Sequence, residues 1–116
     1  MKLLHNPRCS KSREALAALT AKGLQPEIIN YLAHPLDEAA IRVLLTQLSI
    51  APLALVRTKE ALWQEQFAES SLDDDAIIAA LAKHPKLIER PILIHQNRAA
   101  IGRPLENILT LLDTPA

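Results

Sequence analysis

The chain's one cysteine lies in a short polar stretch that is rich in positive charge. A thiol acts as a nucleophile in its thiolate form, and cationic neighbours favour that form by lowering the thiol pKa. The basic residues of this stretch are Arg8, Lys11 and Arg13, and a protonated His5 would add to the positive field around Cys9. The pattern favours a reactive cysteine. The alternative is that Cys9 is a small buried hydrophobic residue, as free cysteines commonly are.

A strand followed by a helix is expected to hold this cysteine in place. The apolar run in Lys2–His5 predicts the strand, and the good helix formers of Ser10–Lys22 predict a helix closed by Gly23. Because the helix would begin directly after Cys9, its unpaired N–H groups and its dipole would favour a thiolate there. Ser12 could also donate a hydroxyl hydrogen bond to the thiolate, or it could be an ordinary first-turn serine.

The rest of the pattern predicts an α/β fold in two halves separated by a helical middle. A strand over Glu27–Tyr31 would follow the first helix, and a right-handed crossover places it parallel to the first strand. Ligands of open α/β sheets gather at the carboxyl ends of such strands, where Cys9 lies. The other predicted elements are a helix capped by Asp37 and ending near Leu48, a short helix capped by Thr58 and reaching Phe67, a helix started by Asp73–Asp75, a hairpin of 92–94 and 98–101 turning at Gln96-Asn97, and a closing helix from Leu105 to Leu112.

Length and composition limit the possible functions. The 116 residues fit one domain, 1–116, and a single cysteine excludes an internal disulfide. No apolar run resembles a signal peptide or a membrane span, so a cytoplasmic protein without membrane contact is expected. Equal numbers of basic and acidic residues, 13 of each, argue against a nucleic-acid partner. No metal site is expected either, because the three consecutive carboxylates of Asp73–Asp75 would point apart and His34, His84 and His95 lack ligand spacing with Cys9.

Four motifs carry a resemblance to a known family. They are His5-Asn6-Pro7-Arg8-Cys9 with Ser12-Arg13, Arg57 after Leu55-Val56, Arg90-Pro91 before an apolar strand, and Gly102-Arg103-Pro104 before the last helix. In this order the chain resembles the glutaredoxin-linked arsenate reductase family almost from end to end. The resemblance implies a thioredoxin-like α/β fold, β-α-β … β-β-α, with a helical insertion between the halves and a mixed four-stranded sheet. It also implies a cis peptide bond before Pro91, which would abut the active cysteine.

The same resemblance implies a reaction and a set of roles. Cys9 would be the nucleophile that reduces arsenate to arsenite, with Arg57, Arg90 and Arg103 holding the oxyanion and His5 and Ser12 in support. Glutathione would be the co-substrate and a glutaredoxin the partner, with no bound cofactor, in a role in arsenical resistance. An external thiol is required because the chain has no second cysteine.

Two departures from the family pattern leave room for another substrate. Ser10-Lys11 stands where better-known members have Gly-Thr, and the chain ends sooner after its last helix. One alternative function is a monothiol oxidoreductase that acts on glutathione mixed disulfides, which explains Cys9 and Pro91 but gives the arginines no task. Another is an Spx-like adaptor that binds RNA polymerase. The redox-switch members of that group carry Cys-x-x-Cys, whereas Ser12 occupies the last position here.

Overall fold

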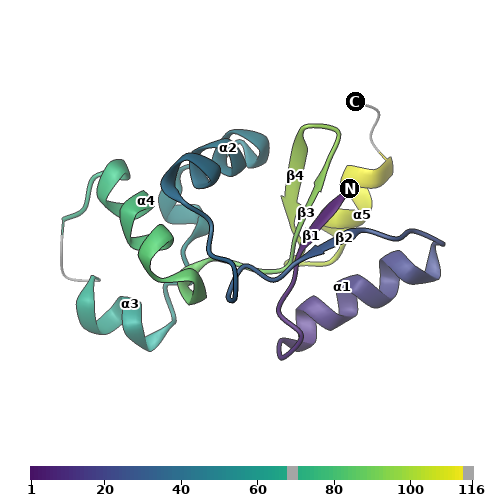
Figure 1. The fold of residues 1–116 in the computed structure, drawn as a ribbon, viewed down its shortest axis with the longest axis horizontal. Coiled ribbons are helices and arrows are strands. Elements are labelled where there is room, and N and C mark those ends of the chain that lie inside the picture. The colour runs from purple at the N-terminus through teal and green to yellow at the C-terminus, as the bar shows by residue number, and fades with distance from the viewer. Residues whose placement is uncertain (68–70, 114–116) are drawn as a thin grey trace. The chain divides into compact units, whose positions relative to one another are not determined.

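The first and last parts of the chain together build one unit around a sheet, and the middle of the chain forms a second unit. In the computed structural model, which describes residues 1–67 and 71–113, the first unit is Met1–His34 with Arg90–Ala116 and the second is Pro35–Glu89. The sheet comprises β1 (Lys2–Leu4), β2 (Glu27–Ile29), β3 (Ile92–His95) and β4 (Arg98–Ile101), in the order β2-β1-β3-β4 (Figure 1). β1 is parallel to β2 and antiparallel to β3, which pairs antiparallel with β4. The mixed four-stranded sheet predicted from the resemblance is therefore confirmed.

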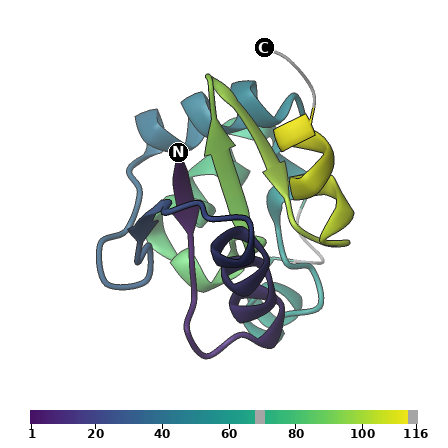
Figure 2. The ribbon, with the colours of Figure 1, turned by 90° about the vertical axis from the view of Figure 1, so that its right-hand side faces the viewer.

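Two helices cover one face of this sheet. Figure 2 shows α1 (Ser10–Ala21) and α5 (Glu106–Asp113) in front of the strands. The core of the first unit consists of apolar side chains from the sheet and from both helices. Its buried members are Leu3, Ala15, Leu19, Leu93, Ile108 and Leu111.

Local sequence explains where α1 ends and where the hairpin turns. Gly23 has a positive φ of +78°, and the N–H groups of Gly23 and Leu24 bond back to Thr20 and Leu19, which is a Schellman motif. Gln96 and Asn97 have φ of 54° and 61°, as a two-residue type I′ turn requires. Both boundaries agree with the sequence prediction, although the first two strands are shorter than predicted.

The second unit is helical. It contains α2 (Glu38–Leu48), α3 (Ala61–Gln66), α4 (Asp74–Lys83) and the 3₁₀ helices η1 (Pro52–Leu55) and η2 (Pro85–Leu87). Asp37 and Asp73 cap α2 and α4 by accepting from Ala40 N–H and Ala76 N–H, each at 2.8 Å. Asp74 and Asp75 lie in the first turn of α4, so the acidic triplet is a helix start, as the sequence indicated. Asp75 also pairs with Arg42 at 2.9 Å.

One predicted cap in this unit is wrong. The residue at the N-cap of α3 is Glu60, not Thr58, and its side chain makes no capping hydrogen bond. The backbone first makes a turn in which Glu60 N–H donates to Arg57 O at 2.9 Å, so the helix starts later than the Thr58 signal suggested. α3 ends at Gln66, and the ring of Phe67 stacks on Trp63 with centroids 5.4 Å apart. Among the described residues, no helix is long and apolar enough to cross a membrane.

Candidate active site

Cys9 occupies the N-cap position of α1, directly after the turn that follows β1. Its backbone is extended, with φ −95° and ψ 123°. Cys9 N–H donates to Asn6 O at 3.0 Å, and Cys9 O accepts from Arg13 N–H at 3.0 Å. Only 9% of the residue surface is exposed. The sulfur therefore sits at the start of the helix, beside its first backbone N–H groups, in a mostly buried residue.

Opposing influences act on the Cys9 thiol. Burial raises its pKa, but backbone hydrogen bonds from Ser12 and Lys11 and a hydrogen bond and positive charge from Arg90 together outweigh burial and lower the pKa. Hydrogen bonds and cations favour the charged sulfur over the neutral thiol. This agrees with the sequence-based expectation of a lowered thiol pKa, while the catalytic role of Cys9 stays a prediction.

Two of the three predicted oxyanion ligands meet at this sulfur. Arg103 Nη2 donates to Cys9 Sγ at 3.3 Å, and Arg103 Nε donates to Arg90 O at 2.6 Å. Arg90 Nε is buried and has no hydrogen-bond partner within the described part of the chain. Arg90 precedes β3 and Arg103 follows β4, and the antiparallel register pairs Ile92 with Ile101. The hairpin therefore brings the two arginines together.

Arg57 belongs to the second unit. There its Nη1 pairs with Glu60 Oε2 at 3.0 Å, and its backbone N–H donates to Leu87 O at 2.7 Å. Its side chain is partly buried in that unit. Its role as a third oxyanion ligand stays a prediction from the family resemblance.

His5 and Ser12 form a buried polar pair behind the cysteine turn. Ser12 Oγ lies 2.7 Å from His5 Nδ1 and accepts from Asn6 N–H at 3.0 Å. Burial lowers the His5 pKa, a backbone hydrogen bond at Ser12 opposes this, and the charge of Arg13 lowers the pKa further. His5 is therefore neutral at neutral pH.

One expectation for this pair needs correction. A protonated His5 does not strengthen the positive field at Cys9, because burial and Arg13 favour the neutral imidazole. The Ser12 hydroxyl oxygen lies against His5 and accepts from Asn6 N–H, and the backbone of Ser12 is hydrogen-bonded to the sulfur. A hydroxyl hydrogen bond from Ser12 to the thiolate stays a prediction.

A close approach beside the arginines depends on a glycine that sequence analysis gave no separate role. A Cβ at Gly102 would lie 2.6 Å from Ile108 Cδ1 and 2.9 Å from Pro91 Cγ, and Gly102 N–H donates to Pro91 O at 2.8 Å. The Arg90-Pro91 bond is cis, as predicted, and so is the Arg103-Pro104 bond, which was not. A glycine directly before a predicted ligand was the available signal.

Asn6 is a second residue that sequence analysis left without a role. Its Oδ1 accepts from Arg8 N–H at 3.0 Å, and its own N–H donates to Ser12 Oγ. Asparagine commonly closes such turns through its side chain, which was the signal in the sequence. Asn6 therefore shapes the turn that presents Cys9. Within residues 1–67 and 71–113, no group of three or more His, Cys, Asp or Glu residues could hold a metal ion.

The fold and the position of the cysteine together define a class. A β-α-β half and a β-β-α half share one mixed sheet, and the cysteine turn follows the first strand, which is the thioredoxin-like arrangement. Within that class, the model of the ArsC family matches residues 4–111, and the chain belongs to this family.

Individual relatives match along nearly the whole chain. The chain is 42% identical to an arsenate reductase of Neisseria meningitidis serogroup A / serotype 4A (strain DSM 15465 / Z2491), with 97% of each sequence covered. It is 46% identical to the uncharacterized protein YfgD of Escherichia coli (strain K12), covering 97% of this chain and 96% of that one. Among solved structures, an arsenate reductase from Vibrio cholerae matches with a TM-score of 0.89 and 44% identity over 94% of each chain.

Proposed function

We propose that this protein reduces arsenate to arsenite, with Cys9 as the nucleophile and with glutathione and a glutaredoxin as electron donors. The observation that carries the proposal is the hydrogen bond from Arg103 Nη2 to Cys9 Sγ at 3.3 Å, with Arg90 acting on the same sulfur. The names of relatives such as the Neisseria meningitidis arsenate reductase support arsenate as the substrate.

Charge explains why a thiolate and an oxyanion need arginines beside them. Both reactants are anionic, so they repel each other unless fixed cations compensate them. A guanidinium group donates parallel hydrogen bonds to a tetrahedral oxyanion and stays charged at any relevant pH. Arg103 already contacts the sulfur, and the buried Nε of Arg90 is a donor without a partner among the described residues. These groups can hold arsenate against Cys9.

The proposed reaction balances with three sulfur atoms. Cys9 sulfur bonds to arsenic, and one arsenate oxygen leaves as water. Glutathione sulfur then bonds to the same arsenic, and a second oxygen leaves as water. A further thiol from glutaredoxin attacks the glutathione sulfur, so a disulfide forms and the electron pair of the sulfur–arsenic bond reduces As(V) to As(III). Water finally releases arsenite and regenerates Cys9.

The chain contributes one of these sulfurs, because it has a single cysteine. The other two must come from separate molecules. A free thiol that depends on reduced glutathione fits a reducing compartment such as the cytoplasm. We therefore place the reaction there.

The test is arsenate-dependent NADPH consumption with glutathione, glutathione reductase and glutaredoxin. Cys9→Ser should abolish turnover, and Arg90→Ala should lower kcat/KM by roughly a hundredfold or more, as the loss of a charge-stabilising donor does. The exposed Lys22, at the other end of α1 from Cys9, is the control, and Lys22→Ala should stay within about twofold of the wild type. Turnover that survives in Cys9→Ser contradicts the mechanism.

Thiol–disulfide exchange is the second candidate, because a lowered thiol pKa also suits a monothiol oxidoreductase. That activity needs no oxyanion ligands. Wild-type protein that removes glutathione from mixed disulfides but does not reduce arsenate would select this candidate. Arg90→Ala would then slow the reaction only as far as it raises the thiol pKa.

A further inference from the structure

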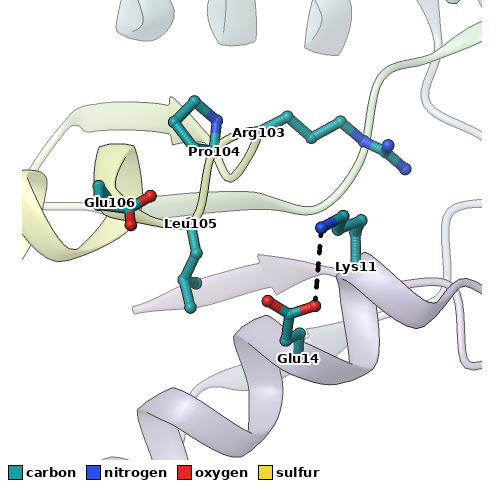
Figure 3. Close-up of a pocket in the computed structure, with 6 residues that line it drawn as sticks. All are labelled: Lys11, Glu14, Arg103, Pro104, Leu105 and Glu106. Carbon is teal, nitrogen blue, oxygen red and sulfur yellow. Dashed lines mark ion pairs between the residues drawn. The ribbon is translucent and has the colours of Figure 1, made fainter.

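A charged cavity of about 340 Å³ lies in the first unit, between the start of α1 and the start of α5. Figure 3 shows Lys11 and Glu14 on α1, facing the loop that carries Arg103, with Leu105 pointing toward the helix. Its volume is at the lower end of the range of small-molecule sites, roughly 300–1,000 Å³. The lining residues are Lys11, Glu14, Arg103, Pro104, Leu105 and Glu106.

This cavity adjoins the nucleophile. Arg103 lines it and also donates to Cys9 Sγ at 3.3 Å. Lys11 lines it as well, and the Lys11 backbone is hydrogen-bonded to the Cys9 sulfur. A molecule bound in the cavity would therefore lie next to whatever is attached to Cys9.

The lining carries charges of both signs. Lys11 and Arg103 are cationic, whereas Glu14 and Glu106 are anionic. Lys11 Nζ and Glu14 Oε2 are 3.9 Å apart, with 56% and 55% of their side-chain surfaces exposed, so they form a weak pair that a ligand can replace. A simple oxyanion would be repelled by the two carboxylates. A molecule with both carboxylate and ammonium groups suits this lining better.

We propose that this cavity binds glutathione, with a ligand carboxylate on Lys11, the ligand ammonium group at Glu106, and the thiol directed toward Cys9. The proposal rests on the proposed function and names the binding site of its thiol co-substrate. During turnover the bound sulfur bonds to arsenic, and an arsenic-bound oxygen leaves as water.

Thiol–disulfide exchange tests the site without arsenate. Cys9 thiolate attacks glutathione disulfide, so one glutathione becomes bonded to Cys9 and the other leaves as a thiolate. The rate with glutathione disulfide is divided by the rate with bis(2-hydroxyethyl) disulfide, which is uncharged, and the quotient is called the glutathione ratio. This ratio cancels any change in the thiol pKa that a variant causes. The dithiodipropionate ratio is the rate with 3,3′-dithiodipropionate divided by the same reference rate. This disulfide has carboxylates but no ammonium or peptide groups.

Lys11→Glu should lower the glutathione ratio by roughly three- to tenfold, the range expected when one or two solvent-screened charge contacts are lost. Glu106→Gln should lower the glutathione ratio but leave the dithiodipropionate ratio unchanged or raised. The exposed Lys22, at the other end of α1, gives the matched control, and Lys22→Glu should leave both ratios within about twofold. In arsenate turnover, Lys11→Glu should raise the KM for glutathione by a larger factor than the KM for arsenate.

Two results would overturn this proposal. One is a glutathione ratio that Lys11→Glu leaves unchanged. The other is that Lys11→Glu and Glu106→Gln each change the glutathione ratio and the dithiodipropionate ratio by the same factor. That result would indicate general charge attraction without a built site. The proposed function fails separately: wild-type protein with the predicted glutathione selectivity but no arsenate turnover would refute arsenate reduction and leave the glutathione site standing.

Discussion

The hydroxyl of Ser12 gives the sharpest test of how the cysteine turn is held. Ser12 is fully buried, and its Oγ accepts from Asn6 N–H at 3.0 Å and lies 2.7 Å from His5 Nδ1. Ser12→Ala removes both hydrogen bonds with little change in volume. It leaves a backbone N–H and an imidazole nitrogen without the partner that they have in the native protein.

The expected cost follows from burial. A buried polar group that loses its partner costs about 1–3 kcal/mol. The His5 contact is fully buried, whereas the Asn6 contact is partly buried and falls at the lower end of that range. The sum is a loss of about 2–4 kcal/mol in the free energy of unfolding. Since whole domains are stable by about 5–15 kcal/mol, such a loss would be plain in an unfolding curve.

Urea unfolding under reducing conditions measures this loss. Ser10→Ala is the matched control, because Ser10 is exposed in the same helical turn, and it should change stability by less than about 0.5 kcal/mol. In a double-mutant cycle, Ser12→Ala and His5→Phe should couple by about 0.5 kcal/mol or more. If Ser12→Ala costs no more than Ser10→Ala, the hydroxyl is not the partner that this turn requires.

Three further outcomes follow from the same unit. Arg90→Gln should raise the pKa of Cys9, so the pH profile of iodoacetamide alkylation should move to higher pH; an unmoved profile would show that Arg90 does not act on the sulfur. Gly102→Ala should lower stability by about 1–3 kcal/mol, because the new methyl group would lie 2.6 Å from Ile108 Cδ1, and a urea midpoint equal to that of the wild type would contradict this packing. The pKa of His5 lies below its ordinary 6.5, so the unfolded chain takes up a proton before the folded protein does as the pH falls through and below 6.5. The free energy of unfolding should therefore fall with pH in that window, and His5→Phe should flatten this dependence.

Local sequence signals sufficed for much of the fold. Asp37 and Asp73 sit before amphipathic segments, and both cap the helices that they were expected to cap. The Gln96-Asn97 pair between two apolar runs predicted a tight hairpin, and both residues have positive φ. Such signals work because capping and turn formation depend on residues within a few positions of each other. Thr58 gave the same kind of signal and failed, because a backbone turn at Arg57–Glu60 delays the helix.

The chemistry of the site depended on burial and on distant partners. His5 could have been charged or neutral from sequence alone, and its burial beside Arg13 decided for neutral. No sequence signal pointed to the contact between the Ser12 hydroxyl and His5, because it depends on where the end of β1 places the His5 ring. The convergence of Arg90 and Arg103 on Cys9 came only from a family resemblance, because no periodicity relates residues so far apart.

The separation between Cys9 and its arginines has a consequence for biosynthesis. The cysteine leaves the ribosome early, whereas the guanidinium group that contacts its sulfur follows 94 residues later. Pro35–Glu89, the whole of the second unit, is translated in between. Until β3 and β4 are in place, the nascent chain lacks the hydrogen bond and the positive charge by which Arg90 lowers the pKa of the Cys9 thiol, and only the backbone of α1 acts on the sulfur. The set of groups that lowers the thiol pKa is therefore complete only once the last part of the chain has folded.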